Sequence, residues 1–139
     1  MLKKDFIVRQ FEESGKFLGI VFGLKKDNKW PELEELINTS AFKYTNIEIA
    51  EAEKIENTNL IETLTQTYSL KEPNLKMLAD LFYEKGIGYS KQFKEEEANS
   101  VFQKAFIIYS FIQANSLEID FSLDMHFKLT SLKQLLYHK

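Results

Sequence analysis

The stretch from Ala79 to Ile112 constrains the fold more than any other part of the sequence, because large and small side chains recur there at helical spacing. The marked positions are Phe82, Gly86, Tyr89, Ala98, Phe102 and Ala105. Their spacing predicts a helix over residues 74–87, a turn, and a second helix over residues 94–115. Small residues let two helix backbones approach closely, and large side chains fill the space beside the crossing. We therefore expect an antiparallel pair in which the two phenylalanines pack beside Gly86 and Ala98.

The rest of the chain also favours helices. Its 139 residues include only five glycines and two prolines, too few for the many tight turns of an all-β domain. Apolar periodicity predicts helices over residues 3–24, 31–44, 60–68 and 123–137. Residues 45–70 leave one helix or two open, with a break at Asn57–Asn59. We expect a single all-helical (all-α) domain over residues 1–139, with five or six helices and the apolar helix 94–115 at its centre.

With Ala79 as position 1, the marked residues fall on positions 4, 8, 11, 20, 24 and 27 of a 34-residue unit, and the stretch resembles a tetratricopeptide repeat (TPR). The match covers about a quarter of the chain, without a second copy at a 34-residue offset. It departs from the family at Lys85, where leucine is expected, at Ser110, where proline closes the repeat, and at the charged run 94–97. The resemblance implies a TPR-like, right-handed array of antiparallel helical hairpins.

The same resemblance implies where a partner would bind. In the family, positions 2, 5, 9 and 12 of the first helix face a concave surface, which here would be a partner-binding groove of Asp80, Tyr83, Ile87 and Ser90. A second likeness concerns the N-terminus, where residues 2–11 and 22–26 resemble the start of a family of small uncharacterised bacterial helical proteins. That likeness implies a bacterial source and no particular activity.

Three of the five glycines form a row at Gly15, Gly19 and Gly23 along the first expected helix. Glycine destabilises a helix interior by roughly 1 kcal/mol relative to alanine, so a row of three indicates that another backbone comes close. A neighbouring helix of the same chain is the simpler explanation, and self-association through this ridge is the alternative. A membrane-surface helix fits least well, because the polar face mixes acidic and basic residues.

Charge and apolar content narrow the function classes. The net charge of −3 and the lack of a basic stripe argue against nucleic-acid binding. The longest apolar run, residues 17–24, is far shorter than the roughly 20 residues of a membrane span. Because the chain has no cysteine, disulfides and thiolate chemistry are excluded. We expect a cytoplasmic protein that binds neither nucleic acid nor membrane.

Catalytic and metal-binding signals are weak. The acidic group Glu32, Glu34 and Glu35 lacks the histidine partner of a di-metal bundle and is typical of a solvated helix start. His126 and His138, the only histidines, have no nucleophile at a suitable spacing. Phosphate loops, dinucleotide fingerprints and paired-histidine metal motifs are absent from the sequence. We expect no catalytic residue, no metal and no cofactor.

These observations favour a protein- or peptide-binding adaptor of unknown biological role. The alternative is a structural protein that forms a homo-oligomer through the glycine ridge. A carboxylate-dependent enzyme is the third hypothesis, and it requires a helical pocket in which Asp or Glu side chains converge.

Overall fold

A computed structural model describes residues 16–17, 19–115 and 123–137, and all regular structure in these ranges is helical, with no strand. The chain divides into two compact units, Met1–Leu36 and Ile37–Lys139. The expected all-helical class is thus confirmed for the described residues. The boundary between the units falls inside helix α2 (Trp30–Thr45).

In the first unit, the described residues of 16–26 are helical, and a turn over residues 27–29 leads into α2. Asn28 takes a left-handed conformation in that turn, with φ of 56°, which asparagine tolerates better than most residues. Pro31 lies in the first turn of α2, where its missing N–H costs no hydrogen bond. In α2, which extends into the second unit, the buried apolar side chains are Leu33, Ile37 and Ala41, each four residues from the next, as expected of one helix face.

Residues 46–70 of the second unit form several short elements rather than one helix. These are α3 (Ile49–Glu53), the 3₁₀ turn η1 (Asn57–Asn59), α4 (Leu60–Glu62) and the π-helical turn η2 (Thr63–Thr67). The break expected at Asn57–Asn59 is confirmed as η1. Leu60 and Leu64 are buried as the apolar pattern predicts, whereas Tyr68 is exposed.

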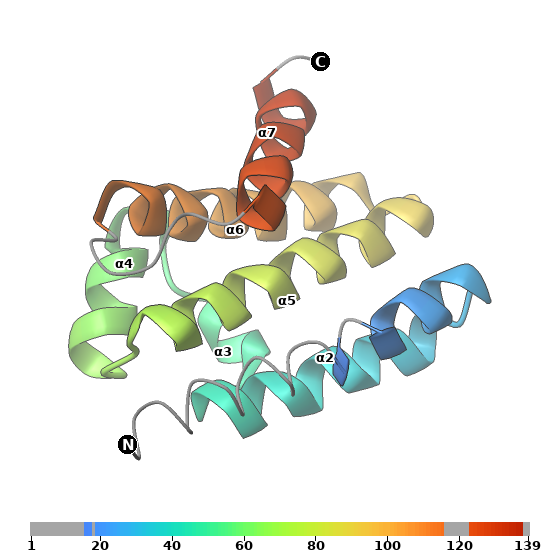
Figure 1. Cartoon of the computed structure of the whole chain (residues 1–139), viewed down its shortest axis with the longest axis horizontal. Coiled ribbons are helices and arrows are strands. Elements are labelled where there is room, and N and C mark those ends of the chain that lie inside the picture. Colours follow the sequence, from blue (N-terminus) through green and yellow to red (C-terminus); the bar gives the residue numbers. More distant parts are fainter. Residues whose placement is uncertain (1–15, 18, 116–122, 138–139) are drawn as a thin grey trace. The chain divides into compact units, whose positions relative to one another are not determined.

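Helices α5 (Glu72–Lys91) and α6 (Glu95–Asn115) form a hairpin and lie side by side, as Figure 1 shows. The predicted end of α5 near Ile87 is wrong, because the helix continues through Gly88 for another turn. Its start also lies earlier than predicted, with Pro73 in the first turn. The Asn74 side chain fixes this start: it accepts a hydrogen bond from the Lys71 N–H (3.3 Å) and donates one to the Tyr44 carbonyl (3.0 Å).

The close crossing of α5 and α6 is confirmed at Gly86. A Cβ atom added to Gly86 would lie 2.8 Å from Cζ of Phe102 and closer still to two other ring carbons, so only glycine fits there without movement. Phe82, Ala98 and Phe102 are all buried beside this contact. The ring of Phe102 therefore packs against the backbone of α5, which fixes how the two helices meet.

The turn between α5 and α6 contains an unexpected residue. Phe93 has a φ of 63° and is 90% exposed. A left-handed conformation is unfavourable for a bulky residue, by roughly 1–2 kcal/mol, and the exposed ring recovers little of this by burial. The sequence gives no glycine at this position to signal such a turn.

Helix α6 is the central element of the second unit, as its apolar sequence predicts, because it contacts α3, η1, α4, α5 and α7 (Leu123–Tyr137). Polar contacts tie the segment before α4 to α6. The buried Lys104 ammonium donates to the Ile55 carbonyl and to Oδ1 of Asn57 (2.9 Å), and Asn57 donates to Gln103 (3.0 Å). Burial lowers the pKa of Lys104, and the nearby Glu53 carboxylate opposes that shift.

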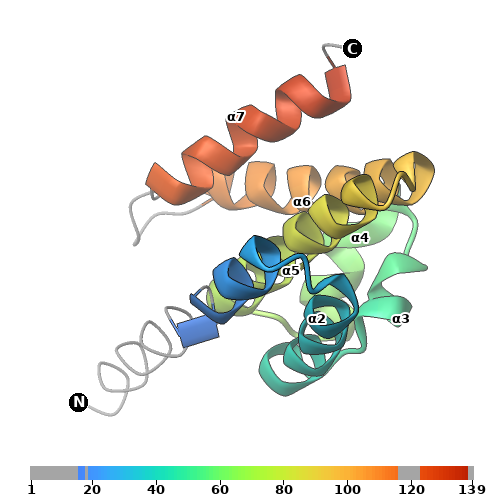
Figure 2. The ribbon, with the colours of Figure 1, turned by 90° about the vertical axis from the view of Figure 1, so that its right-hand side faces the viewer.

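Helix α7 matches the predicted bounds 123–137 and lies at the edge of this unit next to α6 (Figure 2). The buried side chains of α7 are Met125, Lys128, Leu129 and Leu132. The tyrosine ring of Tyr137 meets Phe106 of α6 edge-on, at 5.5 Å between ring centroids.

The crossing predicts opposite effects for the same substitution at two glycines. Gly86→Ala should lower the free energy of unfolding by about 1–3 kcal/mol, because the new methyl group overlaps the Phe102 ring. Gly19→Ala should be neutral or stabilising by up to about 1 kcal/mol, because a Cβ there meets no heavy atom within 4 Å among the described residues. Urea unfolding followed by circular dichroism measures both. Equal effects at the two positions would contradict the crossing.

Candidate functional site: a buried aspartate shared by three helices

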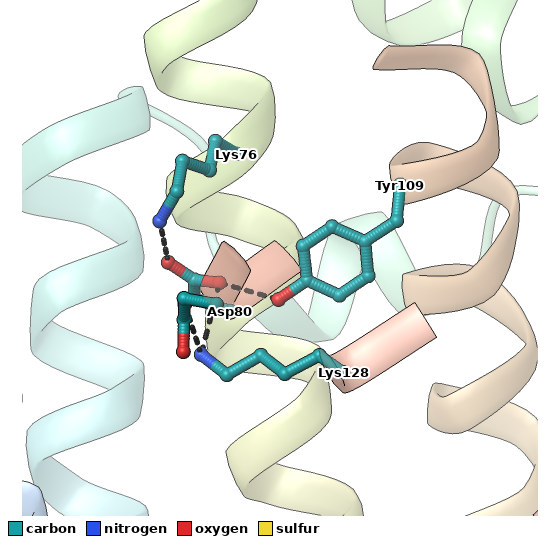
Figure 3. A network of polar contacts seen from close by, with 5 residues as sticks. Lys76, Asp80, Tyr109 and Lys128 are labelled. Atoms are coloured by element: carbon teal, nitrogen blue, oxygen red, sulfur yellow. Dashed lines mark hydrogen bonds and ion pairs between the residues drawn. The ribbon is translucent and has the colours of Figure 1, made fainter. Parts of the chain in front are cut away.

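The most distinctive polar feature of the described residues is the carboxylate of Asp80, in the middle of α5. Its side chain is 2% exposed, and side chains from three helices converge on it (Figure 3). Lys76 approaches Oδ2 at 2.8 Å, Lys128 of α7 approaches Oδ1 at 3.2 Å, and the Tyr109 hydroxyl of α6 donates to Oδ1. Asp80 therefore links α5, α6 and α7 through one buried group.

The local sequence explains two of these contacts. Lys76 precedes Asp80 by four residues, so both lie on one face of α5. Asp124 likewise precedes Lys128 by four residues on α7, and its carboxylate lies 3.3 Å from the ammonium group. Lys128 is thus held between a carboxylate of its own helix and a carboxylate of α5. Tyr109 reaches Asp80 because it is fully buried where α6 faces α5.

Lys128 and Tyr109 both keep their protons at neutral pH, because the pKa of each group is raised above its ordinary value. Burial alone would lower the pKa of Lys128, but the carboxylates of Asp80 and Asp124 outweigh burial and leave that pKa raised. Burial raises the pKa of Tyr109 well above its ordinary value, and the negative charge of Asp80 adds to the rise. Lys128 is therefore a fixed cation and Tyr109 a fixed donor, an arrangement suited to holding charge rather than to transferring protons.

Tyr83 adjoins the cluster one helical turn along α5. The Lys128 ammonium lies 5.4 Å from the centroid of the Tyr83 ring, within the range of a cation–π contact. The centroid of the same ring lies 6.1 Å from that of Phe102, and the side chain of Ser131 of α7 acts on the Tyr83 hydroxyl. Burial raises the pKa of Tyr83, and the Ser131 hydrogen bond works in the opposite direction. Asp80 and Tyr83 thus both contact α7.

The four residues of the expected groove differ in their surroundings. Asp80 lies in the interior, where its carboxylate is engaged by partners within the chain. Tyr83, Ile87 and Ser90 are half-buried and follow one another along α5 at spacings of four and three residues. The Ser90 hydroxyl lies 3.5 Å from Glu95 across the turn. The structure therefore brings Asp80 and Tyr83 together at α7 and leaves Ile87 and Ser90 nearer the end of the helix.

Sequence reasoning missed the roles of Lys128 and Tyr109 in this cluster. The available signal was a lysine within the apolar row Met125, Leu129 and Leu132 of α7. A lysine in such a row usually extends its ammonium group to solvent, so this pattern alone does not identify a buried ion pair.

The glycine ridge is partly described. Gly15 lies outside the described residues, and a Cβ on Gly19 or Gly23 would meet no heavy atom within 4 Å among those that are described. No close neighbour from the described residues therefore lies at these two positions, and packing of another backbone on the ridge stays a prediction. Ile20 and Phe22, on either side of the row, are exposed.

Other candidate sites are limited in the part of the chain that the structure describes. No group of three or more His, Cys, Asp or Glu side chains there could hold a metal ion. His126 is exposed on α7, and His138 lies outside the described residues. None of the described helices combines the length and the apolar content that crossing a bilayer requires.

Comparisons with protein-family models, with curated proteins and with solved structures gave no match.

The Tyr109 contact predicts a measurable stability difference. Tyr109→Phe should lower the free energy of unfolding by about 1.5–3 kcal/mol at pH 7, because it removes a donor to a buried carboxylate. Tyr68→Phe, which changes an exposed tyrosine, should alter it by less than about 0.5 kcal/mol. Urea unfolding of both variants tests this. If the two variants change the free energy of unfolding equally, the hydrogen bond from the Tyr109 hydroxyl to Asp80 does not stabilise the fold.

The raised pKa of Tyr109 also gives a pH dependence. Above pH 10 or so, the ordinary tyrosine pKa, the unfolded chain loses the phenol proton while the folded chain keeps it, so stability falls as pH rises. One proton corresponds to a slope of about 1.4 kcal/mol per pH unit. The slope between about pH 10 and 11.5 should be shallower by roughly this amount in Tyr109→Phe than in the wild type. An unchanged slope would contradict the assignment.

Proposed function

We propose that the protein is a non-enzymatic adaptor that binds a protein or peptide partner through α5. The observation that carries the proposal is the row of half-buried side chains Tyr83, Ile87 and Ser90 on successive turns of one helix face. Half-buried residues in such a row offer a partner apolar contact together with hydrogen-bonding groups on a rigid element. The interior positions Phe82 and Gly86 hold that element in place against α6.

The character of the polar cluster supports binding over catalysis. Lys128 and Tyr109 both hold their protons at neutral pH, so neither is suited to accept a proton from a substrate. The carboxylates of Asp80 and Asp124 both pair with Lys128. The proposal includes a TPR-like relation between α5 and α6, a bacterial cytoplasmic setting, and action without a cofactor.

The adaptor proposal predicts that partner capture depends on Ile87 of α5 and does not depend on Ile107 of α6. Ile87→Glu should abolish capture of the partner by the tagged chain from a lysate of the source cells, because it places a charge in the α5 row. Tyr83→Ala should weaken the same capture. Ile107→Glu, which changes a half-buried isoleucine of α6, is the matched control and should leave the captured protein unchanged. Identical capture by Ile87→Glu and the wild type would show that α5 is not the binding surface.

A second candidate function is a structural role through self-association of the glycine ridge. The observation that favours it is that no described atom lies within 4 Å of a Cβ built on Gly19 or Gly23, with the exposed Ile20 and Phe22 next to them. Small residues with apolar neighbours allow two helices to approach closely and bury both side chains. A homo-oligomer formed in this way would use the same surface of each copy.

Self-association predicts a change of mass in solution. Gly19→Leu should convert the oligomer to monomer, because a branched side chain keeps the two backbones apart. Ser100→Leu, at an exposed position of α6, should leave the mass unchanged. Light scattering over a range of protein concentrations measures both. A wild-type chain that stays monomeric at high concentration would rule out this second function.

A further inference from the structure

Helix α7 is attached to the α5–α6 hairpin by a small set of contacts. Its buried side chains are Met125, Lys128, Leu129 and Leu132, whereas the large apolar side chains Leu123, Phe127, Leu135 and Tyr137 are exposed. Only three apolar residues of α7 are therefore fully removed from water. Figures 1 and 2 show this helix at the edge of its unit, in contact with α6.

The ion pair between Lys128 of α7 and Asp80 adds little to the stability of the fold, but it selects which helix can pack at this position. Removing both charges from water offsets much of the attraction between Lys128 and Asp80. A helix without a positive charge at this position would still cover the Asp80 carboxylate, but would leave it with Lys76 as its only lysine partner. Such burial of a poorly compensated charge is unfavourable. The surface around Asp80 therefore favours a helix that carries a positive charge at this position over one that does not.

Helix α7 contacts two of the four residues for which the family resemblance implies partner binding. Lys128 lies 3.2 Å from the Asp80 carboxylate and 5.4 Å from the centroid of the Tyr83 ring, and Ser131 acts on the Tyr83 hydroxyl. One turn of α7 thus engages the first two residues of the expected groove. A helix seated on these residues shows directly which ligand chemistry they accept.

We propose that the surface formed by Asp80, Tyr83 and Tyr109 binds an amphipathic partner helix with a central lysine, and that α7 is a resident occupant which this partner displaces. The recognised pattern is that of α7: a lysine with apolar residues three positions before it and one and four positions after it. This inference rests on the proposed adaptor function and names the chemistry of its partner. The tether makes α7 a strong competitor, since a linked segment acts at an effective concentration on the order of millimolar.

The test uses the full-length chain and a fluorescent peptide with the sequence of residues 121–137. In a Lys128→Glu chain, the new carboxylate repels Asp80, so α7 should leave and the surface should become free. We expect this chain to bind the peptide at least about tenfold more tightly than the wild type does, measured by fluorescence anisotropy. Lys133→Glu makes the same charge change at an exposed position of α7 and should bind like the wild type.

The peptide itself provides the second comparison. A peptide carrying Lys128→Glu should bind the released surface at least about tenfold more weakly than the native peptide, whereas the Lys133→Glu peptide should retain its binding. A chain that combines Lys128→Glu with Asp80→Asn should lose its preference for the native peptide. If the Lys128→Glu and Lys133→Glu peptides lose the same amount of affinity for the released surface, Asp80 is not the charge that recognises the peptide.

Hydrogen exchange resolved along the chain checks that α7 has left while the hairpin remains. Exchange should accelerate over residues 123–137 and stay slow over residues 72–115. Leu132→Asp provides a second way to release α7 without changing Lys128, and it should also increase peptide binding. If neither released chain binds the peptide better than the wild type, the proposal is wrong. It is equally wrong if both variants lose protection over the hairpin, because α7 is then an integral part of the fold.

The outcomes separate this inference from the adaptor proposal. Peptide binding with purified components tests the Asp80 surface, whereas Ile87→Glu tests whether a cellular partner uses α5. Tight peptide binding together with unchanged capture by Ile87→Glu would remove the adaptor proposal and leave the helix-binding surface. If Ile87→Glu loses capture but the released chains do not bind the peptide, the adaptor proposal stands and the helix-binding surface at Asp80 is ruled out.

Discussion

The contact between the Phe102 ring and the backbone at Gly86 fixes the register of α5 on α6, and the polar centre depends on that register. Tyr109 follows Phe102 by seven residues on α6, and Asp80 precedes Gly86 by six residues on α5. At 1.5 Å per residue these separations are about 10.5 Å and 9 Å, nearly equal along two helices that run in opposite directions. A shift of one turn at the crossing would therefore carry the Tyr109 hydroxyl away from the carboxylate. Apolar packing and the buried hydrogen bond specify the same alignment.

The hairpin could be predicted from the sequence because the residues that determine it are close together in the chain, and because Gly86 is required where the Phe102 ring packs against the backbone. Gly86, Ala98 and Phe102 lie within one short stretch, and their sizes report the crossing directly. The end of α5 was predicted wrongly because glycine is a common stop signal, and at Gly88 the helix continues. The left-handed Phe93 could not be anticipated either, since its residue type disfavours that conformation.

The candidate site was predictable only in part, for a different reason. Asp80 and Tyr83 were identified through a family resemblance, but their main partner Lys128 lies 48 residues from Asp80 in the sequence. Neither periodicity nor composition predicts which charged side chain of a helix distant in sequence will lie next to Asp80. The resemblance implies that this acidic residue belongs to a binding surface, and the structure shows it buried and paired with Lys128 of α7. A polar residue on an otherwise apolar helix face fits both a surface that binds partners and a surface that another part of the chain already covers.

Helices α5 and α7, which both pack on α6, are held by contacts of different kinds. At α5 the main contact is a steric fit, in which loss of one ring or gain of one methyl group changes the packing directly. At α7 the central contact is a lysine between two carboxylates, whose attraction is offset by the cost of removing the charges from water. A steric fit of the first kind suits a permanent hairpin. The second kind gives selectivity with less stability, because a helix of the wrong charge is rejected while the right one is held without a large apolar surface.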